Sequence, residues 1–221
     1  MTYLTGGRRA GGHIMTIQKE AKATAAKVER ILKIARAAFF EAIDFLACIE
    51  ALEAGNRPDI LRSLEAARAG RAGDLLQKAL FGRLLMGVMT AFDPIRPGDF
   101  HLGVGMKLVA EEAPRIALCG MKGANFADIE AAERRWAECL KFEPLDSLRT
   151  YRNKVVAHLS EYPADKDKPI VGQLFQLAAM TAKVAELLAH GTGIAAMSLE
   201  SQVVPFRESS RAFWERWTGS S

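Results

Sequence analysis

The spacing of apolar residues along this 221-residue chain predicts helices nearly throughout. Near the N-terminus, apolar side chains recur every three or four positions, which places them on one face of a long helix expected over residues 16–54. Alternation of β-branched or aromatic residues with polar ones, which would indicate strands, is absent from the sequence. The pattern therefore predicts an all-α protein. The apolar stripe of the first helix is Val28, Ile31, Leu32, Ala35, Phe39, Ile43, Leu46 and Ile49.

Glycine and proline divide the rest of the chain into shorter predicted helices. Proline is tolerated in a first helical turn but disturbs a helix interior, and Pro114 stands inside the fourth predicted helix. Asn125 is a good N-cap for the fifth, because its side chain can accept a hydrogen bond from a free backbone amide. After the first helix we expect helices over residues 58–70, 73–91, from 99 to a break near 121, 126–140, 144–160 and 169–191, and then a short C-terminal helix.

The two ends of the chain differ from its middle. Residues 1–14 are rich in glycine and arginine and are expected to form a disordered basic tail, with Met15 as an alternative start. Residues 15–191 are expected to form one bundle of six to eight helices. Residues 192–221 are expected to be an extension that docks on the bundle or on a partner, because four aromatic residues fall on one helical face. These are Phe206, Phe213, Trp214 and Trp217.

Charge is spread unevenly along the chain. The formal net charge is +4, but residues 1–36 carry eight Lys or Arg residues against two Glu residues, a balance of +6. A basic arm of this kind suits a polyanion such as RNA, although a solvated helix face is an equally simple interpretation. The sequence contains neither an apolar run of membrane-spanning length nor a signal-peptide pattern, so we expect a cytoplasmic protein without membrane contact.

Several chemistries find no support in the sequence. Cys48, Cys119 and Cys139 are an odd number without a Cys-x-x-Cys pair, which argues against a disulfide framework or a zinc site. The four histidines contain no pair at metal-ligand spacing, and no glycine-rich loop follows a predicted strand. His190 falls at the end of a predicted helix, where a cation suits the helix dipole. We therefore expect neither a metal nor a cofactor.

An arginine followed by a histidine after four to six residues supplies a more specific signal. A guanidinium holds phosphate through paired hydrogen bonds, and an imidazole moves a proton near neutral pH. These two groups suffice for metal-free cleavage of RNA when two copies meet. Only Arg152 and His158 lie in a segment predicted to be continuous helix, since the other two pairs fall in the tail and across a Pro-Gly turn. The three pairs are Arg8 with His13, Arg96 with His101, and Arg152 with His158.

Arg152 occupies an unusual place on its predicted helix. The apolar stripe Leu145, Leu148, Val155 and Leu159 lacks one member, and the missing position is residue 152. A charge on an apolar face is costly unless it is paired or bound to a ligand. Two interpretations are open: Arg152 is buried in an ion pair with a carboxylate from another helix, or it lines a polar groove between helices or subunits.

The stretch Leu148-Arg-Thr-Tyr-Arg-Asn-Lys-Val-Val-Ala-His158 resembles the abortive-infection U-type (AbiU-like) branch of the HEPN superfamily. A weaker likeness covers Met89-Thr-Ala-Phe-Asp-Pro94, and the order of helices matches loosely over residues 25–190. The resemblance implies a HEPN-like helical bundle that acts as a metal-independent endoribonuclease of a toxin–antitoxin or phage-defence system. It also implies a homodimer in which two Arg-x5-His motifs face each other across a cleft, with RNA as substrate and an antitoxin protein as a further partner.

The same resemblance assigns roles to individual residues. Arg152 would hold the scissile phosphate, and His158 would act as general base or acid toward a ribose 2′-hydroxyl. Asn153 would orient the histidine or the phosphate, Lys154 would guide the RNA backbone, and Tyr151 would contact substrate. Two alternatives remain beside this hypothesis: a non-catalytic helical module that binds RNA, nucleotide or a protein, and a structural helical dimer whose Arg152 is ion-paired.

Overall fold

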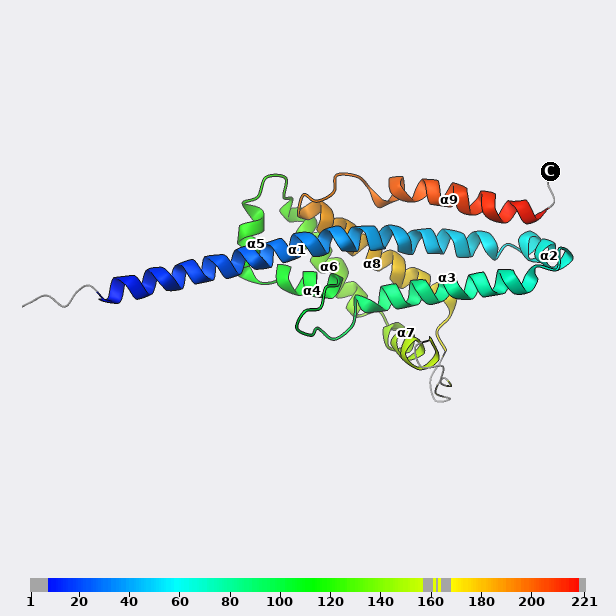
Figure 1. Cartoon of the computed structure of the whole chain (residues 1–221), viewed down its shortest axis with the longest axis horizontal. Helices are drawn as coiled ribbons and strands as arrows, with labels where there is room; N and C mark the ends of the chain where they lie inside the picture. The colour runs from blue at the N-terminus through cyan, green and yellow to red at the C-terminus, as the bar shows by residue number, and fades with distance from the viewer. Residues whose placement is uncertain (1–7, 157–160, 162, 164–167, 219–221) are drawn as a thin grey trace, which may run out of the picture.

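The computed structural model of the chain describes residues 8–156, 161, 163 and 168–218. Across these residues the protein is an all-α bundle without strands, as the apolar pattern predicts (Figure 1). Nine α-helices lie in this part of the chain, together with a π-helical turn (Arg152–Val156) and a 3-10 turn (Arg216–Thr218). The helices are α1 (Arg8–Gly55), α2 (Pro58–Ala66), α3 (Gly70–Thr90), α4 (Leu102–Val109), α5 (Glu112–Cys119), α6 (Phe126–Leu140), α7 (Leu145–Tyr151), α8 (Val171–Gly191) and α9 (Leu199–Glu215).

The bundle is organised around α1, the longest helix. Helix α9 runs along one side of α1 and α3 along another, while α8 crosses behind (Figure 1). Helix α6 packs on α8, and α7 lies across one end of α3. The buried face of α1 includes Ile31, Ala35 and Phe39, which belong to the predicted apolar stripe. Within the described chain, no helix is both long and apolar enough to cross a bilayer.

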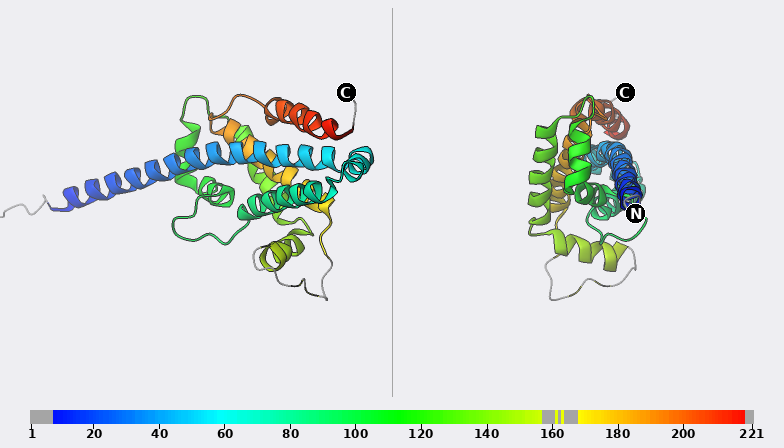
Figure 2. Two further views of the ribbon diagram at one scale, coloured as in Figure 1. Left: turned by 45° about the vertical axis from the view of Figure 1, so that its right-hand side comes forward. Right: turned by 90° about the vertical axis from the view of Figure 1, so that its left-hand side faces the viewer.

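Helix α1 begins earlier than the sequence suggests. It starts at Arg8 rather than near residue 16, so residues 8–14 of the expected tail are helical, while residues 1–7 lie outside the described part. Each glycine in this segment weakens the helix by about 1 kcal/mol relative to alanine. The segment can still be helical, because extending an existing helix is much easier than starting a new one. The N-terminal part of α1 projects beyond the rest of the bundle, as Figure 1 and the left view of Figure 2 show.

The expected fourth helix is two helices in the structure. Helix α4 ends at Val109 and α5 begins at Glu112, with Pro114 in its first turn. A proline at this position could not continue a helix from α4, because it lacks an N–H group and its ring clashes with the carbonyl four residues earlier. With this division, eight described helices precede the C-terminal helix α9, which is the upper end of the expected six to eight. Helix α6, by contrast, has the predicted bounds, and the Asn125 side chain accepts from the amide of Ala127.

The C-terminal extension docks on the bundle through one aromatic side chain rather than four. Trp214 is 2% exposed, and its indole N–H donates to the carbonyl of Ala51 at 3.0 Å. Gly55 makes room for this ring, since a Cβ there would come within 2.7 Å of it. Of the four residues in the expected stripe, Trp214 is the one that is buried in the described structure, against α1 and α2, and docking of the others on a partner stays a prediction. The other three aromatics, Phe206, Phe213 and Trp217, stay exposed.

Candidate functional site

The end of α3, the loop that follows it, α7 and the π-helical turn surround a cavity of about 730 Å³. This volume is typical of pockets that hold small molecules or parts of larger ligands. Four cationic side chains border the cavity against two carboxylates, so the pocket suits an anion. Its lining is Thr90, Asp93, Pro94, Arg96, Asp99, Phe100, His101, Arg149, Arg152, Asn153 and Lys154.

Apolar packing positions the helix that carries Arg152. Leu145 and Leu148 are buried, and the Tyr151 ring meets Phe81 of α3 nearly at right angles, with centroids 6.2 Å apart. The expected continuous α-helix over residues 144–160 is α-helical only to Tyr151, because a π-helical turn follows over residues 152–156, and residues 157–160 lie outside the described part. A π-helical turn inserts an extra residue into the helical repeat, and such turns are frequent at functional sites.

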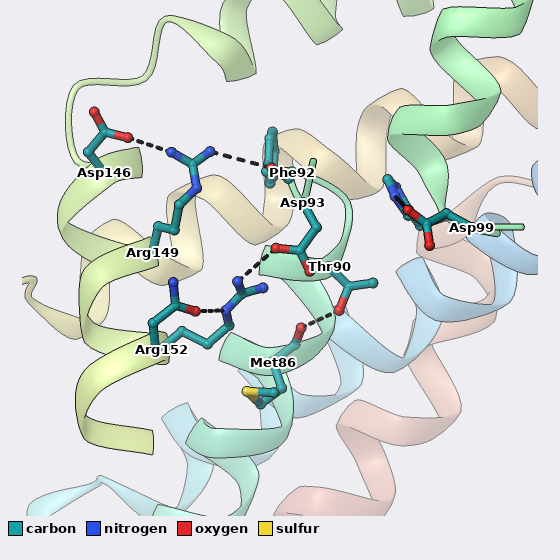
Figure 3. A network of polar contacts seen from close by, with 10 residues as sticks. Met86, Thr90, Phe92, Asp93, Asp99, Asp146, Arg149 and Arg152 are labelled. Atoms are coloured by element: carbon teal, nitrogen blue, oxygen red, sulfur yellow. Dashed lines mark hydrogen bonds and ion pairs between the residues drawn. The ribbon is translucent and has the colours of Figure 1, made fainter. Parts of the chain in front are cut away.

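Arg152 is held at the wall of the pocket by two neighbours. Its Nη2 atom donates to Oδ1 of Asp93 at 2.7 Å, and its Nε atom donates to Oδ1 of Asn153 at 2.9 Å (Figure 3). The side chain of Arg152 is 11% exposed and that of Asp93 is 34% exposed. The third guanidinium nitrogen, Nη1, makes no hydrogen bond to any residue that the structure describes. Both interpretations of Arg152 therefore apply together: it is ion-paired to another element, and it also lines a polar pocket.

Arg149 ties α7 to the end of α3. Its guanidinium pairs with Asp146 at 2.6 Å and donates to the carbonyl of Phe92 at 3.4 Å (Figure 3). The Phe92 ring stacks on Trp136 of α6, with centroids 4.9 Å apart and planes within 10°. The residue next to Phe92 is Asp93, so this packing also fixes the partner of Arg152.

The structure brings together some of the predicted site residues and leaves others apart. Asn153 and Lys154 border the pocket beside Arg152 and are exposed. Tyr151 is not among the lining residues, because its ring faces α3. His158 lies outside the described residues. No spacing along a helix places Asp93 or Asp99 near Arg152. The two signals for that part of the pocket were the Arg96 and His101 pair and the weaker family likeness over residues 89–94.

The basic residues of α1 divide into two groups. Lys27 pairs with Glu111, Arg30 donates to the backbone carbonyl of Asp99, and Lys33 pairs with the exposed Glu29 one turn earlier. The first two contacts tie α1 to other parts of the bundle, so Lys27 and Arg30 already have partners, while Lys33 belongs to a solvated helix face. Lys19 and Lys22 are exposed, and neither forms an ion pair with a residue in the described part of the chain.

Other reactive side chains lie away from the pocket. Burial raises the pKa of the Cys139 thiol to about 11 and also raises the pKa of Cys48, so neither is an activated nucleophile. His190 Nε2 lies 3.0 Å from the carbonyl of Met197, which fits a role at the end of α8. Among the residues with described positions, no group of three His, Cys, Asp or Glu side chains is arranged to hold a metal ion.

Comparison with known proteins identifies a family for most of the chain. A family model for HEPN proteins, described as AbiU2, matches residues 26–213. The matched segment includes the pocket and the helices that frame it, from the middle of α1 to α9. No curated protein matches the chain, and no solved structure matches it either.

Proposed function

This chain belongs to the AbiU2 family of HEPN proteins, and we propose that it is a metal-independent endoribonuclease of a phage-defence (abortive infection) or toxin–antitoxin system, acting in the cytoplasm. One observation carries the proposal: Arg152, oriented by Asp93 and Asn153, borders a pocket whose lining has more positive than negative groups. A fixed guanidinium whose Nη1 has no partner among the described residues is well suited to a phosphodiester, because it can bind the phosphate without reorganising.

Arg152 would bind the scissile phosphate and stabilise the negative charge that develops on its oxygens during cleavage. Asp93 holds the guanidinium at the pocket wall and leaves Nη1 without a described partner. Lys154, which is exposed on the same wall, would attract the RNA backbone through its charge. Asn153 already contacts Arg152 and would keep the guanidinium plane in place.

The proton transfers are assigned to His158 by the family resemblance. One imidazole takes the proton from a ribose 2′-hydroxyl, the oxygen attacks phosphorus, and the bond from phosphorus to the 5′-oxygen breaks. An imidazolium then gives a proton to the departing oxygen. The products are a 2′,3′-cyclic phosphate and a free 5′-hydroxyl, and no metal ion enters the balance.

A second copy of the chain completes the proposed site. One arginine and one histidine are few groups for this reaction, whereas a two-fold axis brings a second pair to the same cleft. We therefore propose a symmetric homodimer, with an antitoxin protein as a further partner. Light scattering at micromolar concentration tests this part: a dimer is expected, and an active monomer would contradict the composite site.

A non-catalytic module that binds RNA or nucleotide is the second candidate. The observation in its favour is the ion pair itself, since Asp93 already compensates the charge of Arg152. Incubation of the purified protein with total RNA and excess EDTA distinguishes the two functions. The endoribonuclease cleaves the RNA under these conditions, whereas a binding module shifts its mobility and leaves it intact.

A further inference from the structure

His101 is a buried imidazole at the wall of the same pocket. It is the residue before α4, its side chain is 7% exposed, and it borders the cavity that Arg152 also borders. Both ring nitrogens are buried, and neither has a hydrogen-bond partner among the residues that the structure describes. A buried polar group without a hydrogen-bond partner destabilises the folded state by about 1–3 kcal/mol. Such a group in a pocket therefore points to a functional role.

The nearest carboxylate does not satisfy the ring. Oδ2 of Asp99 lies 3.9 Å from Nε2 of His101, which is beyond hydrogen-bond distance. That oxygen instead accepts from the backbone amide of Arg96 at 2.5 Å, which holds the turn between the two residues. The carbonyl of Asp99 accepts from Arg30 of α1, so the backbone here is anchored as well. Asp99 Oδ2 thus bonds to the loop backbone and not to the imidazole.

The other side of the ring is closed by close backbone packing. The helix that follows His101 approaches the end of α3 so tightly that a Cβ at Gly103 would lie 2.4 Å from the carbonyl of Ala91. The same Cβ would lie 3.3 Å from Nδ1 of His101, so the ring rests directly against this glycine. The glycine backbone therefore closes one side of the imidazole, while Asp99, which borders the same cavity, lies beside Nε2 on the other.

The fold thus joins two segments that are far apart in the sequence. Arg96 and His101 come from the loop after α3, and Arg152 comes from the turn after α7, yet all three border one cavity. The Arg96 guanidinium is exposed and forms no ion pair with any described residue. One wall of the pocket therefore offers a fixed, paired arginine, and the opposite segment offers an unpaired arginine and an unsatisfied imidazole.

We propose that His101 contacts bound RNA by hydrogen-bonding a ribose 2′-hydroxyl, and that it gives the pocket a preference for RNA over DNA. This inference rests on the proposed function, since it takes RNA as the ligand. An imidazole nitrogen without a hydrogen-bond partner, here Nε2, can donate to or accept from a hydroxyl group. The 2′-hydroxyl is the group by which a protein distinguishes the two nucleic acids at a given position. Binding requires the Asp99 side chain, which borders both ring and cavity, to turn aside.

Binding of matched oligonucleotides tests the proposal independently of cleavage. The full-length protein with His158→Ala keeps RNA intact, and dissociation constants are measured for single-stranded RNA and for DNA of the same sequence. Adding His101→Ala is expected to weaken RNA binding about tenfold and to leave DNA binding within about twofold, since one net hydrogen bond is lost. His101→Asn, which retains a donor and an acceptor, is expected to restore part of the RNA preference.

His190→Ala is the matched control, because His190 already has a partner in Met197 and lies outside the pocket. Equal losses for RNA and DNA, or no loss for either, would overturn the assignment of His101. If the His101 variants do not fold, a second measurement on the protein that retains His101 tests the same proposal. The imidazole nitrogen resonances of His101 in the folded protein are expected to shift with RNA and not with DNA, and identical responses would also overturn it. RNA binding without cleavage would remove the nuclease proposal while leaving this inference in place.

Discussion

Nη2 of Arg152 lies 2.7 Å from Oδ1 of Asp93, although the two residues are 59 positions apart in the sequence. The contact joins the turn after α7 to the loop after α3, and it fixes the orientation of the guanidinium at the pocket wall. Because Asp93 is 34% exposed, the pair is not sealed in the core, and an anion in the pocket can share the guanidinium.

Asp93→Ala should separate positioning from binding. Without its anchor the guanidinium of Arg152 becomes mobile, and the cleavage rate is expected to fall about 10- to 100-fold. RNA binding should not weaken, because the variant removes a negative charge from the pocket. Single-turnover rates and dissociation constants measured together check this, with Asp44→Ala as a control, since Asp44 pairs with the exposed Arg83. Unchanged cleavage by Asp93→Ala would show that the ion pair has no positioning role.

Trp214 should dominate the stability that α9 contributes. Trp214→Ala removes a ring that is 2% exposed and is expected to lower the free energy of unfolding by about 3–5 kcal/mol. Phe206→Ala, at a residue that is 46% exposed on the same helix, should cost about 1 kcal/mol or less. Urea unfolding of both variants provides the comparison. Similar losses for the two would mean that the aromatic residues dock as one stripe.

Glu186 should make the attachment of α9 sensitive to acid. Burial raises its pKa, but hydrogen bonds from Lys183 and the amide of Leu199 outweigh burial, so its pKa lies below the ordinary value. A carboxylate whose pKa is lowered in the folded state stabilises the fold at pH values above its ordinary pKa of about 4.3. This stabilisation is lost as the pH falls through the lowered pKa.

Glu186→Gln is therefore expected to lower the free energy of unfolding by about 1–2 kcal/mol at neutral pH and to change it less near pH 4. Urea unfolding at both pH values measures the difference. Glu138→Gln, which breaks an exposed pair with Arg135, serves as the control and should change little. A constant loss for Glu186→Gln at both pH values would assign its effect to packing rather than to charge.

The projecting part of α1 should add affinity without chemistry. Lys19 and Lys22 are exposed and form no ion pair within the described structure, so neutralising both should weaken RNA binding and reduce its dependence on salt. Lys33, which pairs with Glu29, is the matched control and should have a smaller effect. Filter binding over a range of salt concentrations measures the slope, and an unchanged slope for the double variant would leave these lysines as a solvated surface.

Local signals in the sequence were sufficient for much of the fold. The bounds of α6 follow from Asn125 and the apolar spacing after it, because a cap and a helical repeat are both short-range features. Pro114 signals a break, but whether a helix bends or divides at a proline depends on its neighbours in the bundle. The aromatic residues of α9 were identified, whereas the burial of Trp214 alone depends on Gly55, which is distant in sequence.

Only the site residues that are adjacent to Arg152 in the sequence were predictable. The unusual position of Arg152 is visible from the apolar stripe around it, and Asn153 and Lys154 follow because they are adjacent. Asp93 and His101 reach the pocket through the packing of α3, α4 and α7, which no spacing rule reports. The π-helical turn was not predicted either, because the apolar spacing around it is that of an ordinary helix.

The cleavage rate of Arg152→Ala in excess EDTA tests the central claim most directly. The wild-type protein is expected to cut RNA and to leave 2′,3′-cyclic phosphate ends, and Arg135→Ala, which lies outside the pocket, should do the same. Arg152→Ala should cut at least about 100-fold more slowly, because it removes the group that stabilises the developing charge. Circular dichroism should show the variant folded, since its ion pair is partly solvated. Cleavage by folded Arg152→Ala at the wild-type rate would contradict the account.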